Sequence, residues 1–392
     1  TEENMNETPL TKSDIESFQD LARQFTKNSI RPMMDGDFSD GNPEMVPSII
    51  ESAFETGLAS IPDITNSGKQ YGVWGSMTDV SGTASSIVIL STIAETCGAI
   101  AMGLNAQGVA SNILSHLSHN LPYTPVKTAL GLQEGIYPPS YGLIKSPEKW
   151  TPDYITTTAE LKHGEYKLTG KKDFLYVIDT PDTFVIFAIV DSKWGCFVIP
   201  ADIPGIKIIK TGQRTGIRAC KVMGIELNDV KIPSDFRIDS DNAEDLLLKG
   251  LGFYWYGIAA IAAGIARGSL SAAKEYCAER YQGGTIIKKH SAIKMLIAEA
   301  ESKTTVIEQS LKEIDNAGFN TPQFLKKAAI AKLTATQLCS QAVTDCLQTF
   351  GGYGYIEDFG MEKRLRDSAV LKSTCGPPHY LKQFVFDIDQ GE

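Results

Sequence analysis

The sequence predicts an α+β protein with a helical N-terminal part, a β-rich middle part and a C-terminal helical bundle. Apolar residues recur at helical spacing over the first and last thirds of the chain. Between positions 138 and 233, by contrast, eight prolines separate short β-rich runs. We therefore expect a helical domain over residues 1–131, a β-barrel-like domain over 132–240 and a four-helix bundle over 241–392.

The N-terminal part begins with a predicted helix start. Ser13 and Glu16 have the spacing of a capping box, which satisfies free N–H groups of a first helical turn. A longer helical stretch is expected from about 82 to 117, where small residues would allow another helix or a ligand to approach closely. We interpret this stretch first as core.

The middle part contains several runs typical of strands. His163-Gly164-Glu165 separates two of them as a hairpin turn would, and the turn-prone pair Asn228-Asp229 is expected to end another. The predicted strands cover residues 154–161, 183–190, 196–199, 206–209 and 221–227.

The last third returns to helical periodicity. Helices are expected over 257–280 and 293–314, and a third begins at Pro322 and stops at Gly351-Gly352. Proline suits the first turn of a helix, and glycine suits the position just after its end.

Composition narrows the classes of protein. The 392 residues carry a net charge of -10 with a pI near 5.2, which argues against a nucleic-acid binder because such proteins rely on a basic face. No apolar run approaches the roughly 18 to 20 residues of a membrane span, and the polar start lacks the features of a secretory signal. Seven scattered cysteines show no metal-ligand spacing. We expect a cytoplasmic protein with free thiols, no metal and no membrane partner.

Several motifs resemble those of one family. Residues 348–355, QTFGGYGY, followed by 361–367, MEKRLRD, resemble the C-terminal signature of the acyl-CoA dehydrogenase superfamily. Weaker similarities lie at 279–284, 290–293, 163–172 and 216–233. The resemblance implies the three-domain fold of that superfamily and an FAD-dependent oxidoreductase that acts on an acyl thioester.

The same signature implies a cofactor site. In the family the residues matching Arg280, Gln348, Gly351 and Gly352 hold the FAD of a neighbouring subunit, so the resemblance implies a homo-oligomer, usually a tetramer. Glycine lets the backbone approach an anion, and the planar guanidinium of arginine can pair with a pyrophosphate. The competing interpretation is a helix-ending glycine pair and a surface arginine.

Two further segments match the flavin-ring contacts of the family less well. Tyr137 and Ser140 resemble its Y-x-x-T, and Phe174 and Tyr176 stand where it has W-I-T-N or F-I-T-N. In the family, the segment E-P-x-A-G-S-D follows the Y-x-x-T motif, and other residues replace it here over 141–147. The contacts to the flavin ring are therefore expected to differ from those usual in the family. As an alternative, Phe174 and Tyr176 are ordinary strand residues.

The catalytic carboxylate of the family is missing. Desaturation of an acyl thioester needs a base for the α-proton, and Cys375 occupies the position of the glutamate in the family's Y-E-G-T. Some relatives place this glutamate instead at the position of Tyr254, which Trp255 follows here. Three hypotheses remain open: Cys375 is a thiolate base, His379 or Tyr254 takes this role, or Cys375 only fills space.

These departures favour a specialised substrate. The leading hypothesis is an oxidoreductase in biosynthesis, with the acyl group on CoA or on an acyl carrier protein, rather than general β-oxidation. An alternative is a flavin-dependent monooxygenase of the same fold, which needs no base for an α-proton. A non-catalytic relative is the third class, and the electron acceptor stays open.

Overall fold

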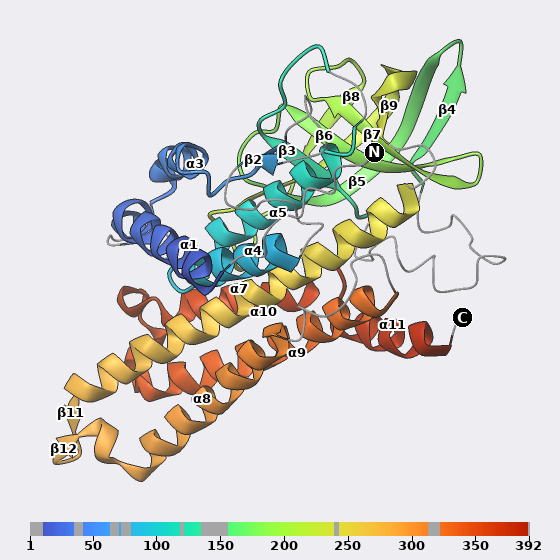
Figure 1. The fold of residues 1–392 in the computed structure, drawn as a ribbon. Coiled ribbons are helices and arrows are strands. Elements are labelled where there is room, and N and C mark those ends of the chain that lie inside the picture. Colours follow the sequence, from blue (N-terminus) through green and yellow to red (C-terminus); the bar gives the residue numbers. More distant parts are fainter. Residues whose placement is uncertain are drawn as a thin grey trace.

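The computed structural model describes residues 11–34, 42–62, 70–71, 80–117, 121–134, 156–238, 243–312 and 322–390. Figure 1 shows the β-sheet at one end of the molecule and long C-terminal helices at the other, with the N-terminal helices beside them. The order of helical, β and helical parts agrees with the sequence prediction.

The first helix, α1 (Lys12–Phe25), is capped two residues earlier than predicted. Its cap is Thr11, whose hydroxyl accepts from the Asp14 N–H while the Asp14 carboxylate accepts from the Thr11 N–H. The prediction at Ser13 is wrong because Ser13 already lies in the helix, where its carbonyl accepts from Ser17. Short elements follow: η1 (Thr26–Ile30), α2 (Arg31–Met34), η2 (Pro43–Met45), α3 (Val46–Glu55), β1 (Ile61–Pro62) and β2 (Gln70–Tyr71).

The predicted helix over 82–117 is two helices, α4 (Val80–Ala94) and α5 (Gly98–Leu114). Every residue of α5 is buried, as the core interpretation expected. Helix α4 packs closely against the long helix α7 (Ala243–Glu279), and this contact depends on small residues. A side chain at Gly264 of α7 would collide with the carbonyl of Ser91 in α4. Helix α5 contacts α7 and also strands of the sheet, so it forms the central layer between them.

One eight-stranded sheet forms the middle part, in the order β10-β7-β6-β4-β5-β9-β8, and β3 pairs in parallel with β6. The hairpin at His163-Gly164 is confirmed, with φ of 53° and 82°. Asn228-Asp229 does not end β9; the pair forms a bulge, because pairing with β5 continues on both sides of it. The strands are β3 (Thr128–Gly131), β4 (Thr158–Lys162), β5 (Glu165–Val177), β6 (Thr183–Val190), β7 (Lys193–Pro200), β8 (Ile206–Lys210), β9 (Lys221–Pro233) and, after η4 (Ser234–Phe236), β10 (Arg237–Ile238).

In the C-terminal bundle, α7, α8 (Ser291–Lys312) and α10 (Met361–Ser373) pack around α9 (Pro322–Thr349). Helix α11 (Pro378–Gln390) covers one end of the bundle. The predicted start of α9 at Pro322 and its stop before Gly351 are confirmed. α7 begins 14 residues earlier than expected. The connections contain β11 (Tyr281–Gln282), β12 (Thr285–Ile286), η5 (Ile287–Lys289), η7 (Gly351–Tyr355) and η8 (Glu357–Phe359).

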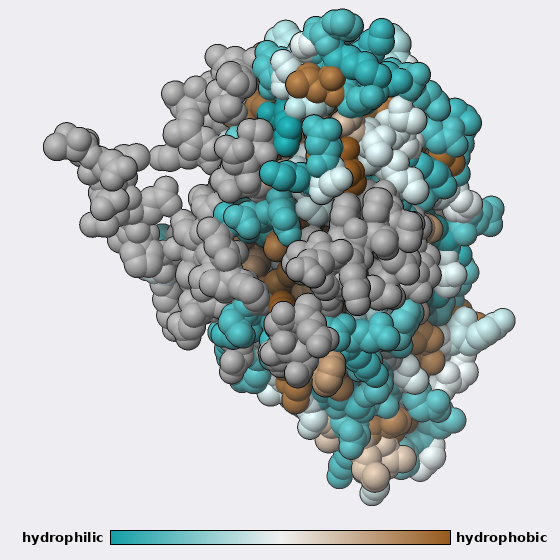
Figure 2. Space-filling view, turned by 90° about the vertical axis from the view of Figure 1, so that its right-hand side faces the viewer, coloured by the Kyte–Doolittle hydropathy of each residue, from teal (hydrophilic) through white to brown (hydrophobic). Residues whose placement is uncertain are grey.

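The longest helix is also the most apolar. α7 has the length and hydropathy of a bilayer span, but 89% of its apolar window is buried inside the protein, as in the core helix of a globular protein. On the face drawn in Figure 2, hydrophilic residues cover most of the upper and lower parts, and apolar residues show only in small groups.

Candidate active site

A small cavity lies where the N-terminal helices, the sheet and the bundle meet. Its walls come from α5, β3 and the residues after it, β5, α7 and the turn after α10. The lining residues are Ala106, Leu130, Leu132, Gln133, Asp173, Phe174, Tyr176, Tyr254 and Cys375. The structure thus brings four predicted site residues, Phe174, Tyr176, Tyr254 and Cys375, into one cavity.

A β-bulge shapes the wall formed by β5. The register with β9 shifts between Lys172 and Leu175, and Phe174 adopts a left-handed conformation with φ of 53°. The Asp173 N–H leaves the ladder and donates to the Gln133 carbonyl at 2.8 Å. Bulges often re-aim side chains beside functional sites. Sequence reasoning missed Asp173, the one carboxylate residue in the cavity lining, whose Oδ1 pairs with Lys171 at 2.8 Å.

The turn that carries Cys375 is strained and firmly held. Cys375 has φ of 50° and is followed by Gly376 at 116°, so a non-glycine residue occupies the left-handed region. The indole N–H of Trp255 donates to the Cys375 carbonyl at 2.6 Å. On the other side, the Thr374 hydroxyl lies 3.0 Å from the Tyr176 hydroxyl, which links the bundle to the sheet. These contacts hold Cys375 at the cavity wall.

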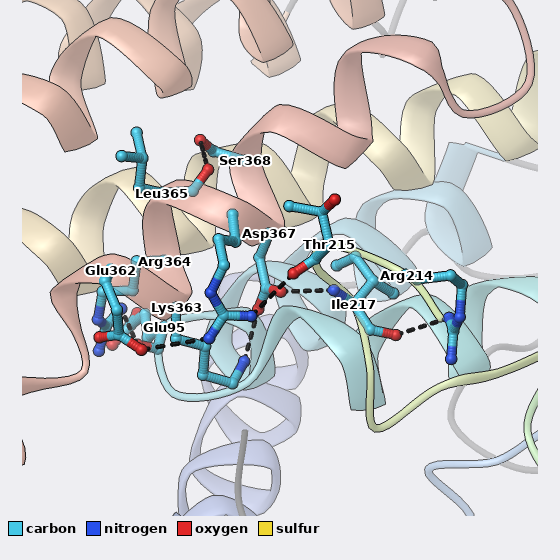
Figure 3. Close-up of polar contacts among 11 residues, drawn as sticks. Glu95, Arg214, Thr215, Ile217, Glu362, Lys363, Arg364, Leu365, Asp367 and Ser368 are labelled. Atoms are coloured by element: carbon cyan, nitrogen blue, oxygen red, sulfur yellow. Dashed lines mark hydrogen bonds and ion pairs between the residues drawn. The ribbon is translucent and has the colours of Figure 1, made fainter. Parts of the chain in front are cut away.

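The helix before this turn is anchored to two other parts of the protein (Figure 3). Asp367 accepts from the Ile217 N–H at 2.5 Å and from the buried Lys363 ammonium at 2.5 Å. Arg366 donates to the Thr215 carbonyl at 2.9 Å. Arg364 adds a bond to the carbonyl of Glu95, between α4 and α5, at 2.7 Å. Arg364, Arg366 and Asp367 therefore fix α10, and with it Cys375, against the β-domain loop and the N-terminal helices.

The protonation states bear on two of the predicted bases. Burial raises the pKa of the Cys375 thiol to about 12, although the charge of Lys332 and the Trp255 indole oppose this. Burial likewise raises the pKa of the Tyr254 phenol well above its ordinary value. At neutral pH both groups carry their protons, which argues against the thiolate hypothesis for Cys375.

The third catalytic candidate lies elsewhere. His379 is exposed on α11 and is absent from the cavity lining, whereas its neighbour Tyr380 is buried. The helical direction of α11 turns His379 outward. The prediction that His379 acts at this site is contradicted by its position.

A buried ion pair links the loop after β3 to strand β5. The Lys172 ammonium lies 2.7 Å from Glu134 Oε1, and both side chains are buried. Thr156 and Thr157 also donate to this carboxylate. Burial raises the pKa of Glu134, but the Lys172 charge and these hydrogen bonds outweigh it, so the pKa lies below its ordinary value. Glu134 is thus a structural anion for the loop after β3.

The predicted pyrophosphate residues lie at the far end of α7 and α9. The Arg280 guanidinium stacks on the Tyr353 ring at 5.0 Å, and its Nε is buried without a hydrogen-bond partner among the described residues. Gly351 has φ of 59°, and no atom lies within 4 Å of a side chain built there or at Gly352. Gln348 is exposed on the last turn of α9. Tyr137 and Ser140 lie outside the described residues.

Comparisons with known proteins agree with this architecture. The family described as acyl-CoA dehydrogenase, C-terminal domain, matches residues 246–385. The short-chain specific acyl-CoA dehydrogenase of Clostridium acetobutylicum is 27% identical over 91% of this chain and 93% of its own length. These findings support membership of the chain in the acyl-CoA dehydrogenase superfamily.

Solved structures show the shared fold. Butyryl-CoA dehydrogenase from Megasphaera elsdenii superposes with a TM-score of 0.77, at 20% identity, over 97% of this chain and 98% of that one. A prolyl acyl carrier protein oxidase does so with a TM-score of 0.76, at 17% identity, over 96% and 99%. As a superfamily member, the chain is an oxidoreductase of the acyl-CoA dehydrogenase type, and this superfamily is FAD-dependent.

The residues present fit FAD at the pyrophosphate end. The unpartnered Arg280 Nε and the open backbone at Gly351 and Gly352 form a donor set suited to a pyrophosphate. At the ring end the cavity is aromatic, with Phe174, Tyr176 and Tyr254 in its lining.

We expect Arg280→Met to weaken FAD retention about 10- to 100-fold, because one charge-assisted hydrogen-bonding group contributes about 1.5 to 3 kcal/mol. The measurement is the flavin absorbance of purified protein and its loss on gel filtration. Lys288→Met, a nearby surface substitution, is the control. Equal flavin content in the Arg280→Met and wild-type proteins would contradict this assignment.

Proposed function

We propose that the chain is an FAD-dependent oxidoreductase that acts on an acyl thioester with a specialised acyl group. The observation that carries this proposal is the cavity that joins Cys375, Tyr254 and Tyr176 in a superfamily member with no carboxylate at either usual base position. The departure of both base positions from the family pattern favours a specialised acyl group over a general fatty acyl chain. The reaction then belongs to biosynthesis rather than to general β-oxidation.

The residues of the chain contribute position and proton chemistry. When bound, FAD supplies the acceptor for the hydride of the acyl β-carbon. Leu130, Leu132 and Ala106 supply the apolar wall for the acyl chain, and Tyr254 supplies a protonated hydroxyl. The buried turn at Cys375 places a thiol proton at the cavity wall.

The carrier of the acyl group is proposed to be CoA or an acyl carrier protein. One structurally similar protein is described as a prolyl acyl carrier protein oxidase, which supports the second carrier. We further propose a cytoplasmic homo-oligomer, usually a tetramer in this superfamily. All seven cysteines are free thiols, which supports the reducing compartment of the cytoplasm. Exposed Tyr353, Tyr355 and Ile356, next to Arg280, support contact with a second copy.

The test is a substrate panel. Purified holoprotein is mixed anaerobically with matched acyl groups on CoA and on an acyl carrier protein, and flavin absorbance near 450 nm is followed. We expect bleaching by a functionalised acyl thioester and little by long saturated acyl-CoAs. Bleaching by ordinary fatty acyl-CoAs alone would contradict the specialised assignment.

A second candidate is a flavin-dependent monooxygenase of the same fold. The protonated states of Cys375 and Tyr254 favour it, because oxygen transfer needs no base for an α-proton. It predicts substrate-dependent oxygen consumption when a flavin reductase is present, together with a hydroxylated product. Turnover under anaerobic conditions with an artificial electron acceptor would exclude it.

A further inference from the structure

The cavity lining contains two hydroxyl groups, and their partners differ. The Tyr176 hydroxyl lies 3.0 Å from the Thr374 hydroxyl, an ordinary hydrogen-bond distance between two oxygens. Within the part of the chain that the structure describes, the Tyr254 hydroxyl donates only to the thioether sulfur of Met102, at 3.9 Å. Thioether sulfur is a weak acceptor. The Tyr254 hydroxyl therefore keeps most of its hydrogen-bonding capacity.

Tyr254 is buried and its backbone is held in place. The residue is 5% exposed, and its carbonyl accepts from the side-chain amide of Asn105 at 3.3 Å. Asn105 fits against α7 because Gly257 has no side chain; a Cβ atom there would overlap the Asn105 amide oxygen. A buried hydroxyl with one weak acceptor is unfavourable unless a ligand supplies a better partner. Helices α5 and α7 thus hold Tyr254 at the cavity wall with its hydroxyl nearly unpaired.

The wall beside Tyr254 is largely apolar. Ala106, one helical turn after Met102 on α5, lines the cavity together with Leu130 and Leu132. A plain alkyl chain would satisfy this wall but would leave the Tyr254 hydroxyl without a partner. An oxygen atom carried on such a chain satisfies both the wall and the hydroxyl.

We infer that the Tyr254 hydroxyl donates a hydrogen bond to an oxygen substituent on the acyl chain of the substrate. This inference rests on the proposed function and narrows it. The substrate class is an acyl thioester whose chain carries a hydroxyl, ether or keto oxygen. Tyr254 is then a specificity-determining residue, which contacts the substrate without removing its α-proton.

The protonation of the hydroxyl agrees with a donor role. Burial raises the pKa of the Tyr254 phenol well above its ordinary value, and charges on Cys375, Tyr176 or Cys220 would raise this pKa further. The phenol therefore keeps its proton in the neutral range. A neutral phenol donates to an oxygen acceptor, whereas the carboxylate that some relatives have at this position can only accept.

The experiment compares pairs of phosphopantetheine thioesters, because CoA and acyl carrier proteins share this group. In each pair a terminal hydroxyl replaces a terminal methyl group: 3-hydroxypropionyl with butyryl, 4-hydroxybutyryl with pentanoyl, and 5-hydroxypentanoyl with hexanoyl. Dissociation constants are measured by isothermal titration calorimetry. The holoprotein is kept anaerobic and its flavin is reduced with dithionite, so that no thioester is oxidised during the titration.

For at least one pair, the wild type should bind the hydroxyl member about tenfold or more tightly, because the methyl member leaves the Tyr254 hydroxyl unpaired. In Tyr254→Phe this order should reverse, because the buried hydroxyl of the ligand then lacks a partner. Tyr123→Phe is the matched control. It removes a hydroxyl that accepts from Thr183 outside the cavity lining, and it should keep the wild-type preference.

Two results overturn the inference. The first is a methyl member that binds at least as tightly as the hydroxyl member in all three pairs of the wild type, and this result does not depend on the folding of any variant. Water is then the partner of the Tyr254 hydroxyl. The second is a preference for the hydroxyl member that persists in Tyr254→Phe.

These outcomes are separate from those of the substrate panel. A preference for the hydroxyl member in binding, with no thioester able to bleach the oxidised flavin, would contradict the proposed function alone. Flavin bleaching by acyl thioesters without such a preference would contradict the role of Tyr254 alone.

Discussion

Asp367→Asn is expected to lower the free energy of unfolding by about 3 to 5 kcal/mol, because it removes the carboxylate that pairs with the buried Lys363 charge. The same substitution weakens the bond to the Ile217 N–H that ties α10 to the β-domain loop. Equilibrium urea denaturation followed by far-UV circular dichroism measures the change.

The matched control is Asp20→Asn. Asp20 pairs with Arg23 at 3.2 Å, but both side chains are more than half exposed, so the expected change is below about 0.5 kcal/mol. If Asp367→Asn were as mild as Asp20→Asn, α10 would not depend on this anchor, and the fixed position of Cys375 would need another cause.

The second large effect concerns the pH dependence of stability. A lysine whose folded pKa is about 7 binds fewer protons in the native than in the unfolded state above that pH, where its unfolded pKa is near 10.5. Its contribution to stability therefore increases as pH rises from 7 towards 10. Between pH 7 and pH 9 the increase is about 2 to 3 kcal/mol.

Comparison with Lys332→Met isolates this contribution, because the cysteines and other groups titrate in both proteins. The free energy of unfolding of wild type minus that of Lys332→Met should rise by that amount between pH 7 and pH 9. A constant difference would show that Lys332 stays charged in the native state, and Lys327→Met serves as the control on the same helix.

The sequence predicted the fold because its signals are local. Periodicity and the residues Pro322 and Gly351 were enough to place α9, and the strand β6 (Thr183–Val190) coincides with its predicted run. Errors arose where two local signals competed: Thr11 and Asp14 form the capping box in place of Ser13 and Glu16. At Asn228-Asp229, continued pairing with β5 prevailed over turn propensity.

The site was predictable only in part. Motif resemblance identified Cys375 and Tyr254, which do line one cavity. Asp173 enters the lining through a bulge, and a register shift between two strands leaves no local signal. Lys332 lies 43 positions from Cys375, in a stretch that reads as an ordinary amphipathic helix. Its burial without a carboxylate partner among the described residues depends on tertiary packing.

The most direct measurement of chemistry at this cavity is exchange of the α-hydrogens of a bound acyl thioester with D2O, followed by mass spectrometry. The thioester is the panel member that bleaches the flavin. We expect wild type and the exposed-site control His379→Ala to incorporate deuterium at equal rates. Cys375→Ala should be slower by about 100-fold or more, as for loss of a general acid–base group. Equal exchange by Cys375→Ala and wild type would show that the α-proton does not move through Cys375.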